Sequence, residues 1–182
     1  SYQKINYASG IESFKAKKYS NAITLLQRSK KYPQDAVTAA NASFWIGESY
    51  YRQNDFKKAI KEYKVFLSSS AAKKSSYFTT AKYSLGYCYF KEKNYSEAAD
   101  AFNSFISSSN KNQKMLSDAC NRIGDCNFIL QRHNDAIKYY DRAMTYADNQ
   151  NDYSLYYKAT ALGAINKLND KAFTLMCSQF SV

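Results

Sequence analysis

The single histidine of this chain, His133, is the side chain best suited to acid–base chemistry near neutral pH. A general base needs a partner within hydrogen-bonding reach, and the spacing of the sequence places none beside it. His133 instead occupies a repeated position at which Tyr19, Phe56 and Tyr95 stand elsewhere in the chain. We therefore interpret His133 as a packing residue.

Phosphate-binding and hydrolase motifs are also missing from the sequence. It contains no Gly-rich phosphate loop, no Gly-x-Ser-x-Gly turn and no His-Glu-x-x-His helix. Serine runs at residues 68–70, 75–76 and 107–109 could accept phosphate, but serine is also favoured at helix ends, which is the interpretation we prefer. We expect no enzymatic activity and no cofactor.

The four cysteines could in principle hold a metal ion. Cys120 and Cys126 are six residues apart, and neither a Cys-x-x-Cys pair nor a histidine pair completes a zinc site. Cys88 and Cys126 each follow a recurring glycine by two residues, which is typical of small apolar filler in a helix interface. We expect no metal site, and the cysteine count leaves the redox compartment open.

Composition predicts a folded helical chain. Of the 182 residues, 45% are hydrophobic and 16% aromatic, whereas one proline and five glycines are too few turn residues for an all-β domain. No run of about 18 apolar residues could span a membrane. Residues 1–10 have neither an initiator Met nor the order of a signal peptide, so we expect a processed chain or a piece of a longer one.

The five glycines mark an internal repeat. They stand at Gly10, Gly47, Gly86, Gly124 and Gly163, which are 37, 39, 38 and 39 residues apart. Counted from each glycine, position +12 holds Ala22, Ala59, Ala98 and Ala136, and Leu175 in the fifth copy. A glycine inside a helix costs about 1 kcal/mol relative to alanine, so its recurrence predicts a close approach by a neighbouring helix.

Large side chains recur in the same register. Position +4 holds Phe14, Tyr51, Phe90 and Phe128, and position +16 holds Leu26, Tyr63, Phe102 and Tyr140. Polar turn pairs such as Asn54-Asp55 separate the glycine from the alanine, which predicts two helices per repeat. The expected repeats span residues 3–35, 38–72, 77–111, 115–149 and 153–182, form one array, and end in a degenerate or truncated copy.

The strings from Phe44 to Ile60 and from Tyr83 to Ala98 resemble tetratricopeptide repeats. This resemblance implies an all-α, right-handed superhelical solenoid and a role in binding proteins or peptides. The period near 38 residues departs from the family's 34, with the additional residues in serine-rich connectors. Stacked repeats share one core, and Phe173, Leu175 and Met176 still need cover, so a longer parent chain or end-to-end self-association is expected.

The last repeat, from Ala161 to Ala172, is similar to irregular repeats of long envelope-associated proteins of Bacteroidetes, and the Lys, Asn, Tyr and Ser bias fits that source. This similarity favours a periplasmic or envelope-associated location over a cytoplasmic one. The sequence itself carries no readable address.

In the resembling family, the first helices of successive repeats line a groove that receives a peptide. The corresponding positions are Tyr7, Ile11 and Phe14; Asn41, Phe44, Glu48, Tyr51 and Arg52; Thr80, Tyr83, Tyr87, Phe90 and Lys91; and Asp118, Asn121, Asp125 and Phe128. Family members that clamp a C-terminal carboxylate use Lys, Asn and Arg, whereas the corresponding positions here include Trp45 and Ser84. We expect no such clamp.

Two interpretations of the aromatic groove positions remain open. Aromatic pairs seven residues apart lie on one helical face, as in Tyr7 and Phe14 or Tyr83 and Phe90. They could be core residues that close the wide repeat against its neighbour. Alternatively, tyrosines mixed with charged residues on the same face are typical of an interface.

The net charge of +11 lies entirely in the first half, because residues 1–91 carry 16 Lys/Arg against 5 Asp/Glu and residues 92–182 carry 10 of each. The lysines concerned include Lys15, Lys17, Lys18, Lys30, Lys31, Lys57, Lys58, Lys61, Lys64, Lys73 and Lys74. They could bind nucleic acid or an anionic surface. We prefer a protein-interaction scaffold, because lysines on one helix face usually serve solubility.

Overall fold

The computed structural model describes residues 1–108, 112–146 and 152–179, with side chains described as far as residue 171. Within these ranges the chain is helical and contains no strand, which confirms the predicted all-α repeat fold. The chain divides into two compact units, Ser1–Ser108 and Ser109–Val182. We call them the N-terminal unit and the C-terminal unit.

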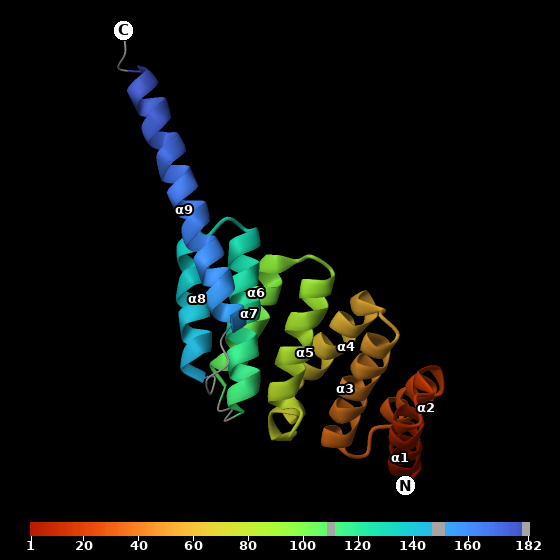
Figure 1. The fold of residues 1–182 in the computed structure, drawn as a ribbon. Coiled ribbons are helices and arrows are strands. Elements are labelled where there is room, and N and C mark those ends of the chain that lie inside the picture. Colours follow the sequence, from red (N-terminus) through yellow and green to blue (C-terminus); the bar gives the residue numbers. More distant parts are fainter. Residues whose placement is uncertain (109–111, 147–151, 180–182) are drawn as a thin grey trace. The chain divides into compact units, whose positions relative to one another are not determined.

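The N-terminal unit contains three helix pairs (Figure 1). They are α1 (Tyr2–Lys15) with α2 (Tyr19–Lys31), α3 (Ala36–Arg52) with α4 (Phe56–Ser68), and α5 (Phe78–Lys91) with α6 (Tyr95–Ile106). A short 3₁₀ helix, η1 (Ser70–Lys74), occupies the serine-rich connector between α4 and α5. The first helix of the middle pair, α3, contacts both α1 and α5, so the three first helices are neighbours.

Each repeat glycine of these pairs faces the large residue at position +16 of the second helix. A Cβ atom added at Gly10 would lie 2.7 Å from Leu26 Cγ, and one at Gly86 would lie 2.8 Å from Phe102 Cδ1. Real Cβ atoms do not approach carbon so closely, so only glycine lets these helices pack at this distance. The alanine at position +12 lies in the same interface, since Ala22 and Ala98 are fully buried.

The turns inside the pairs share an unusual backbone conformation. Lys17, Asn54, Lys93 and Gln131 have φ angles of 59°, 60°, 61° and 60°, in the left-handed region. Side chains other than glycine and asparagine are strained there. The same turn geometry therefore recurs in all four complete repeats, although the residue types differ.

Polar side chains fix the helix starts and one connector. Asp35 and Asp55 cap α3 and α4 by accepting hydrogen bonds from the backbone N–H groups three residues later. The buried amide of Gln3 accepts hydrogen bonds from the backbone N–H groups of Gln34 and Asp35 at 2.9 and 2.8 Å. Gln3 thereby ties α1 to the connector between the first two repeats.

The C-terminal unit contains α7 (Gln113–Ile129), α8 (His133–Tyr146) and α9 (Asp152–Gln179). Helix α8 packs against both α7 and α9. The pair of α7 and α8 repeats the glycine contact, because a Cβ at Gly124 would lie 2.5 Å from Tyr140 Cε1. Figure 1 shows α9 running back along α8 and continuing well past the end at which α8 begins.

The fifth repeat differs from the expected helix pair. Its described part is one helix, because α9 runs without a break from Asp152 to Gln179. Gly163 corrects the expectation of a close helix contact at every repeat glycine, since a Cβ added there would meet none of the described residues within 4 Å. The apolar residues expected to need cover, Phe173, Leu175 and Met176, lie outside the described side chains. The expected ends of the third, fourth and fifth repeats fall at 109–111, 147–151 and 180–182, which lie outside the described residues.

None of the helices in the described ranges combines the length and hydropathy that a membrane crossing requires. Among the described residues, no three His, Cys, Asp or Glu side chains lie together as a metal site would need.

Candidate functional site

The predicted groove residues at position +4 pack against the start of their own second helix. The ring pairs are Phe14 with Tyr19, Tyr51 with Phe56, Phe90 with Tyr95, and Phe128 with His133, with centroid separations of 5.5, 5.6, 5.5 and 5.2 Å. Edge-on aromatic pairs of this kind stabilise a packed interface. These four rings therefore brace the turn of each repeat, and His133 takes the place of a tyrosine or phenylalanine.

The aromatic residues at position −3 pack inward to different degrees. Phe44 is 2% exposed and stacks on Tyr77 at 4.7 Å, so it belongs to the core and not to an open groove surface. Tyr83 is half-buried against Phe102 and Phe105, with centroids 5.8 and 5.0 Å away. The sequence left open whether the aromatic groove positions are core or interface residues, and Phe44 is a core residue.

Position +1, directly after the glycine, holds an acid in the second and fourth repeats. Glu48 accepts a hydrogen bond from the Tyr63 hydroxyl at 2.6 Å and one from Ser84 at 2.9 Å. Asp125 accepts from the Tyr140 hydroxyl at 3.0 Å. The tyrosine that covers the glycine thus finds an acceptor on the same first helix, so both predicted groove acids take part in repeat packing.

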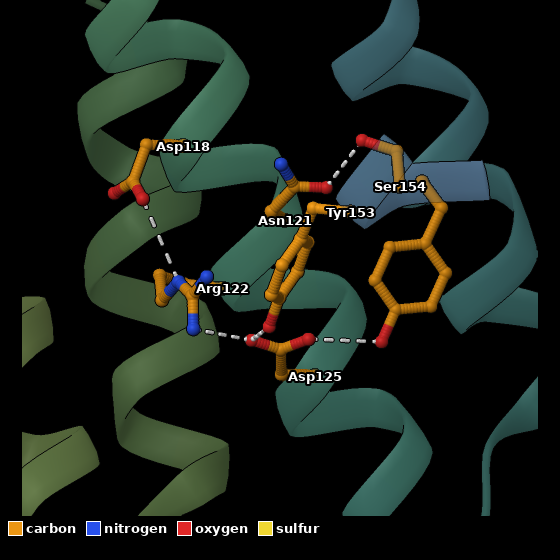
Figure 2. Close-up of polar contacts among 7 residues, drawn as sticks. Asp118, Asn121, Arg122, Asp125, Tyr153 and Ser154 are labelled. Carbon is orange, nitrogen blue, oxygen red and sulfur yellow. Dashed lines mark hydrogen bonds and ion pairs between the residues drawn. The ribbon is translucent and has the colours of Figure 1, made fainter. Parts of the chain in front are cut away.

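Asp125 is the centre of a larger polar network in the C-terminal unit (Figure 2). Beyond Tyr140, its carboxylate accepts from the Tyr153 hydroxyl at 2.8 Å and forms an ion pair with Arg122 at 2.7 Å. The Arg122 guanidinium also lies 4.9 Å from the centre of the Tyr153 ring and pairs with Asp118 at 3.6 Å. This network joins α7 to both α8 and α9.

A second polar contact supports the same junction. Asn121, another predicted groove residue, accepts a hydrogen bond from Ser154 at 2.8 Å, and both side chains are buried. Burial raises the pKa of Asp125 above its ordinary value, although Arg122 and the two tyrosine hydroxyls oppose that rise. Asn121 and Asp125 are therefore held inside the helix packing and are not open to a partner.

The predicted site residues of α1 and α3 surround an aromatic cluster that includes two unpredicted members. Phe14 contacts the Trp45 ring at 4.9 Å, and Trp45 contacts Tyr77 at 5.4 Å. The half-buried hydroxyl of Tyr7 faces Trp45, Tyr77 and Asn41, and burial is the main reason that its pKa rises to about 12. Within the described residues the buried Trp45 Nε1 has no hydrogen-bond acceptor.

Sequence reasoning missed Trp45 and Tyr77 for different reasons. Trp45 stands at position −2, which carries no recurring residue type, and Tyr77 directly precedes α5 outside the helical register. Ser75 was counted among helix-end serines, yet its hydroxyl donates to Asn41 at 2.6 Å. A tryptophan in a chain that has only one could have drawn attention to this cluster.

Basic residues end the three first helices of the N-terminal unit. Lys15, Arg52 and Lys91 are the last residues of α1, α3 and α5, and all three are exposed. A cation at a helix C-terminus is favoured by the helix dipole, which is a structural reason for their type. Lys15 pairs with Glu12 at 2.9 Å, whereas within the described residues Arg52 and Lys91 form no ion pair.

The buried cysteines are poorly suited to reactions. Cys88, Cys120 and Cys126 are free and fully buried. Burial raises the pKa of the Cys120 thiol to about 11 and that of Cys126 to about 12, and it raises the pKa of Cys88 further. Since the thiolate is the reactive form, these thiols act as packing groups at neutral pH.

Comparisons with known proteins agree with the geometry of the repeats. Residues 15–102 match the family described as anaphase-promoting complex, cyclosome, subunit 3, and residues 117–150 match the tetratricopeptide repeat family. Among curated proteins none matches the sequence. The chain is a tetratricopeptide-repeat protein.

Solved structures with the same fold are distant in sequence. The apo form of RapI is 17% identical with a TM-score of 0.66, over 98% of this chain and 69% of RapI. MamA from Desulfovibrio magneticus RS-1 is 14% identical with a TM-score of 0.69, over 100% of this chain and 98% of MamA. BtubC from P. vanneervenii is 14% identical with a TM-score of 0.58, over 95% and 79%. These likenesses show the fold, and the repeat family supports a protein-interaction scaffold as the general role.

Proposed function

We propose that the chain binds a protein partner by holding a peptide segment of it along the first helices α1, α3 and α5. The observation that carries this proposal is the combination of half-buried tyrosines with exposed cations that form no ion pair within the described residues, on one set of neighbouring helices. Tyr7, Tyr51 and Tyr87 provide rings on these helices, and Arg52 and Lys91 provide charge. Tyrosine and arginine are the residue types that most often anchor a partner.

The charge of the N-terminal unit indicates which partner segment fits. Residues 1–91 carry 16 basic against 5 acidic side chains. An acidic segment would therefore be attracted before contact, and its charges would not face an excess of like charges in the complex. The Asn41 amide and the Tyr7 hydroxyl are polar groups that a peptide backbone could approach at the same face. The groove acid Glu48 is already engaged by Tyr63 and Ser84.

The second candidate function is binding of nucleic acid or of an anionic surface. The exposed lysines of α4, Lys57, Lys61 and Lys64, favour it because they form one charged helix face. They lie on a second helix of a repeat, whereas the tyrosines and cations above lie on first helices. The two functions therefore use different side chains and can be separated by substitution.

Site-specific photocrosslinking in a lysate of the source organism tests the peptide proposal. A photoreactive phenylalanine analogue replaces Tyr51 in one variant and exposed Lys61 of α4 in a matched control. We expect a protein that crosslinks through position 51 and does not crosslink through position 61. Equal capture by both variants, or capture only through position 61, would place recognition elsewhere than on the first helices.

A salt titration then separates the two candidate functions. Binding to DNA, RNA or anionic vesicles should weaken steeply as salt rises, because counterions are released on binding. We expect no binding of these polyanions at about 50 mM salt, where such electrostatic affinity is high. Strong binding that Lys57→Ala, Lys61→Ala and Lys64→Ala together abolish would favour the second function.

A further inference from the structure

The outer face of α9 is exposed at positions that are buried in the other repeats. Position −1 holds Ile46, Leu85 and Ile123 in the second, third and fourth repeats, with exposed fractions of 0%, 8% and 0%. In α9 the same position holds Leu162, which is 45% exposed. All four residues have branched aliphatic side chains, and of the four Leu162 alone is exposed.

The surface of α9 beside Leu162 also lacks the side chain that fills each of the other repeat glycines. Gly10, Gly47, Gly86 and Gly124 each face a leucine, tyrosine or phenylalanine from the helix that follows, whereas Gly163 faces no atom of the described residues within 4 Å. In every filled case the large residue stands four positions after a buried alanine, as Tyr140 follows Ala136. Four copies therefore define one chemical pattern for the helix that fits this surface.

The exposed residues of α9 form a continuous apolar stripe. Leu155, Ala159, Leu162 and Gly163 are spaced four, three and one residues apart, so they lie on one helical face, and all four are exposed. The opposite face holds α9 in place, because Ala161 is fully buried. Large exposed apolar stripes on a well-anchored helix mark interaction sites.

Contacts within the unit anchor the first half of α9 without using the stripe. Ser154 donates to Asn121 at 2.8 Å, and Lys158 forms an ion pair with Asp141 at 2.6 Å. The Tyr153 hydroxyl adds its bond to Asp125. The stripe is therefore a surface on an anchored helix and is left free by the described contacts.

We infer that the outer face of α9 binds an amphipathic helix of another protein, with alanine and, four residues later, leucine, tyrosine or phenylalanine on its apolar face. The large residue occupies the space above Gly163, and the alanine lets the two backbones approach. The helix lies antiparallel to α9, as the second helix does in each complete repeat. An extended peptide would not reproduce this packing, because the pattern has the period of a helix.

A helix with this pattern is available as a probe from the chain itself. Residues 132–146 contain Ala136 and Tyr140, and a hydrocarbon staple joining positions 138 and 142 on the exposed side would hold the short peptide helical. Fluorescence anisotropy of the labelled peptide against the intact protein measures binding. We expect saturable binding that falls at least about tenfold in Gly163→Leu, since the added side chain occupies the site.

Matched controls make the result specific. Lys171→Ala alters α9 outside the stripe and should leave peptide binding unchanged, and a peptide carrying Tyr140→Ala should bind the intact protein about tenfold less tightly. Equal binding to the parent protein and to Gly163→Leu, or no binding at all, would overturn the inference. A parent dimer in sedimentation that Gly163→Leu converts to monomer would instead assign this face to a second copy of the chain.

This surface is independent of the proposed peptide site. Arg52→Ala and Lys91→Ala should leave binding of the stapled helix unaffected, because neither residue belongs to the C-terminal unit. Failure of the stapled helix to bind would therefore leave the proposal for α1, α3 and α5 intact, and the reverse also holds.

Discussion

Gly124 and Gly163 hold the same repeat position 39 residues apart, yet their surroundings are opposite. A Cβ at Gly124 would collide with the Tyr140 ring at 2.5 Å, whereas a Cβ at Gly163 would meet nothing within 4 Å in the part of the chain that the structure describes. Gly124 is required by the helix packed against it. Gly163 has the conformational cost of a helical glycine without that contact, which shows that a repeated residue need not have a repeated environment.

The largest expected change in the free energy of unfolding comes from single variants in which Gly124 or Gly163 is replaced by leucine. Gly124→Leu should lower the free energy of unfolding by at least about 3 kcal/mol, because the side chain would drive α7 and α8 apart. Gly163→Leu should raise it by up to about 1 kcal/mol, since leucine is a better helix former than glycine. Urea unfolding followed by circular dichroism measures both.

Equal destabilisation by the two leucines would contradict the comparison. Gly86→Leu is a further control in the N-terminal unit, where Phe102 takes the place of Tyr140. It should behave like Gly124→Leu. If Gly86→Leu unfolded within a few degrees of the parent, the helix contact at the repeat glycines would be misplaced.

The next largest expected effect is a difference in stability loss between the second and fourth repeats, in which a tyrosine covers the repeat glycine. Tyr140→Phe removes a hydrogen bond to Asp125, which is 8% exposed, and should cost about 1–2 kcal/mol. Tyr63→Phe removes the equivalent bond to half-buried Glu48, which keeps Ser84 and can recruit water, so about 0.5–1 kcal/mol is expected. Chemical unfolding of both variants checks the order, and a larger loss in Tyr63→Phe would reverse it.

A smaller and pH-dependent effect is expected at Asp125. Its pKa is raised in the folded chain by burial, so as pH rises from about 4 the unfolded chain releases this proton first. The contribution of Asp125 to the free energy of unfolding therefore falls as pH rises through the folded pKa. Compared with Asp125→Asn, the parent should lose stability over this range.

Unfolding of the parent and of Asp125→Asn at a series of pH values measures this difference. Asp118, Arg122, Tyr140 and Tyr153 face the carboxylate and are unchanged in the variant. A parent that gained stability relative to Asp125→Asn with rising pH would show that the ion pair with Arg122 outweighs burial.

The smallest effect concerns the turns that join the paired helices. Lys93 has φ of 61°, and glycine adopts this conformation without strain, so Lys93→Gly should stabilise the chain by about 1 kcal/mol. Asn54 has φ of 60° and is already tolerated there, so Asn54→Gly should change stability by a few tenths of a kcal/mol. Thermal melts of the pair measure the contrast. Destabilisation by Lys93→Gly would indicate that its side chain has an unrecognised contact.

Much of the fold could be predicted because packing leaves a periodic record in the sequence. A glycine, a small residue twelve positions later and a large residue sixteen positions later are physically linked, since they meet in one helix interface. Asn54-Asp55 identified a turn and a cap because their side chains act locally. The same periodicity could not reveal that α9 is continuous, because Asn169 and Asp170 are turn residues that helical neighbours can override.

The candidate site was less predictable because groove and core share residue types. Phe44 and Tyr83 occupy the same repeat position, but only Phe44 is fully covered, by Tyr77 from the following connector. Glu48 and Asp125 have the polarity of groove residues. Each nevertheless accepts a hydrogen bond from the tyrosine at position +16 of its own repeat, Tyr63 or Tyr140. The contact of Phe44 with Tyr77 joins two repeats, and the contacts of Glu48 and Asp125 depend on where each side chain points, which residue type and spacing do not determine.

The most direct test of the account is the affinity of the crosslinked partner segment for two double variants of equal charge change. Arg52→Ala with Lys91→Ala removes two exposed cations from first helices, and Lys61→Ala with Lys64→Ala removes two exposed cations from α4. Isothermal titration at about 150 mM salt measures both. We predict at least about tenfold weaker binding in the first variant and less than about twofold in the second. Equal losses in both would show that recognition follows total charge and does not use the first helices.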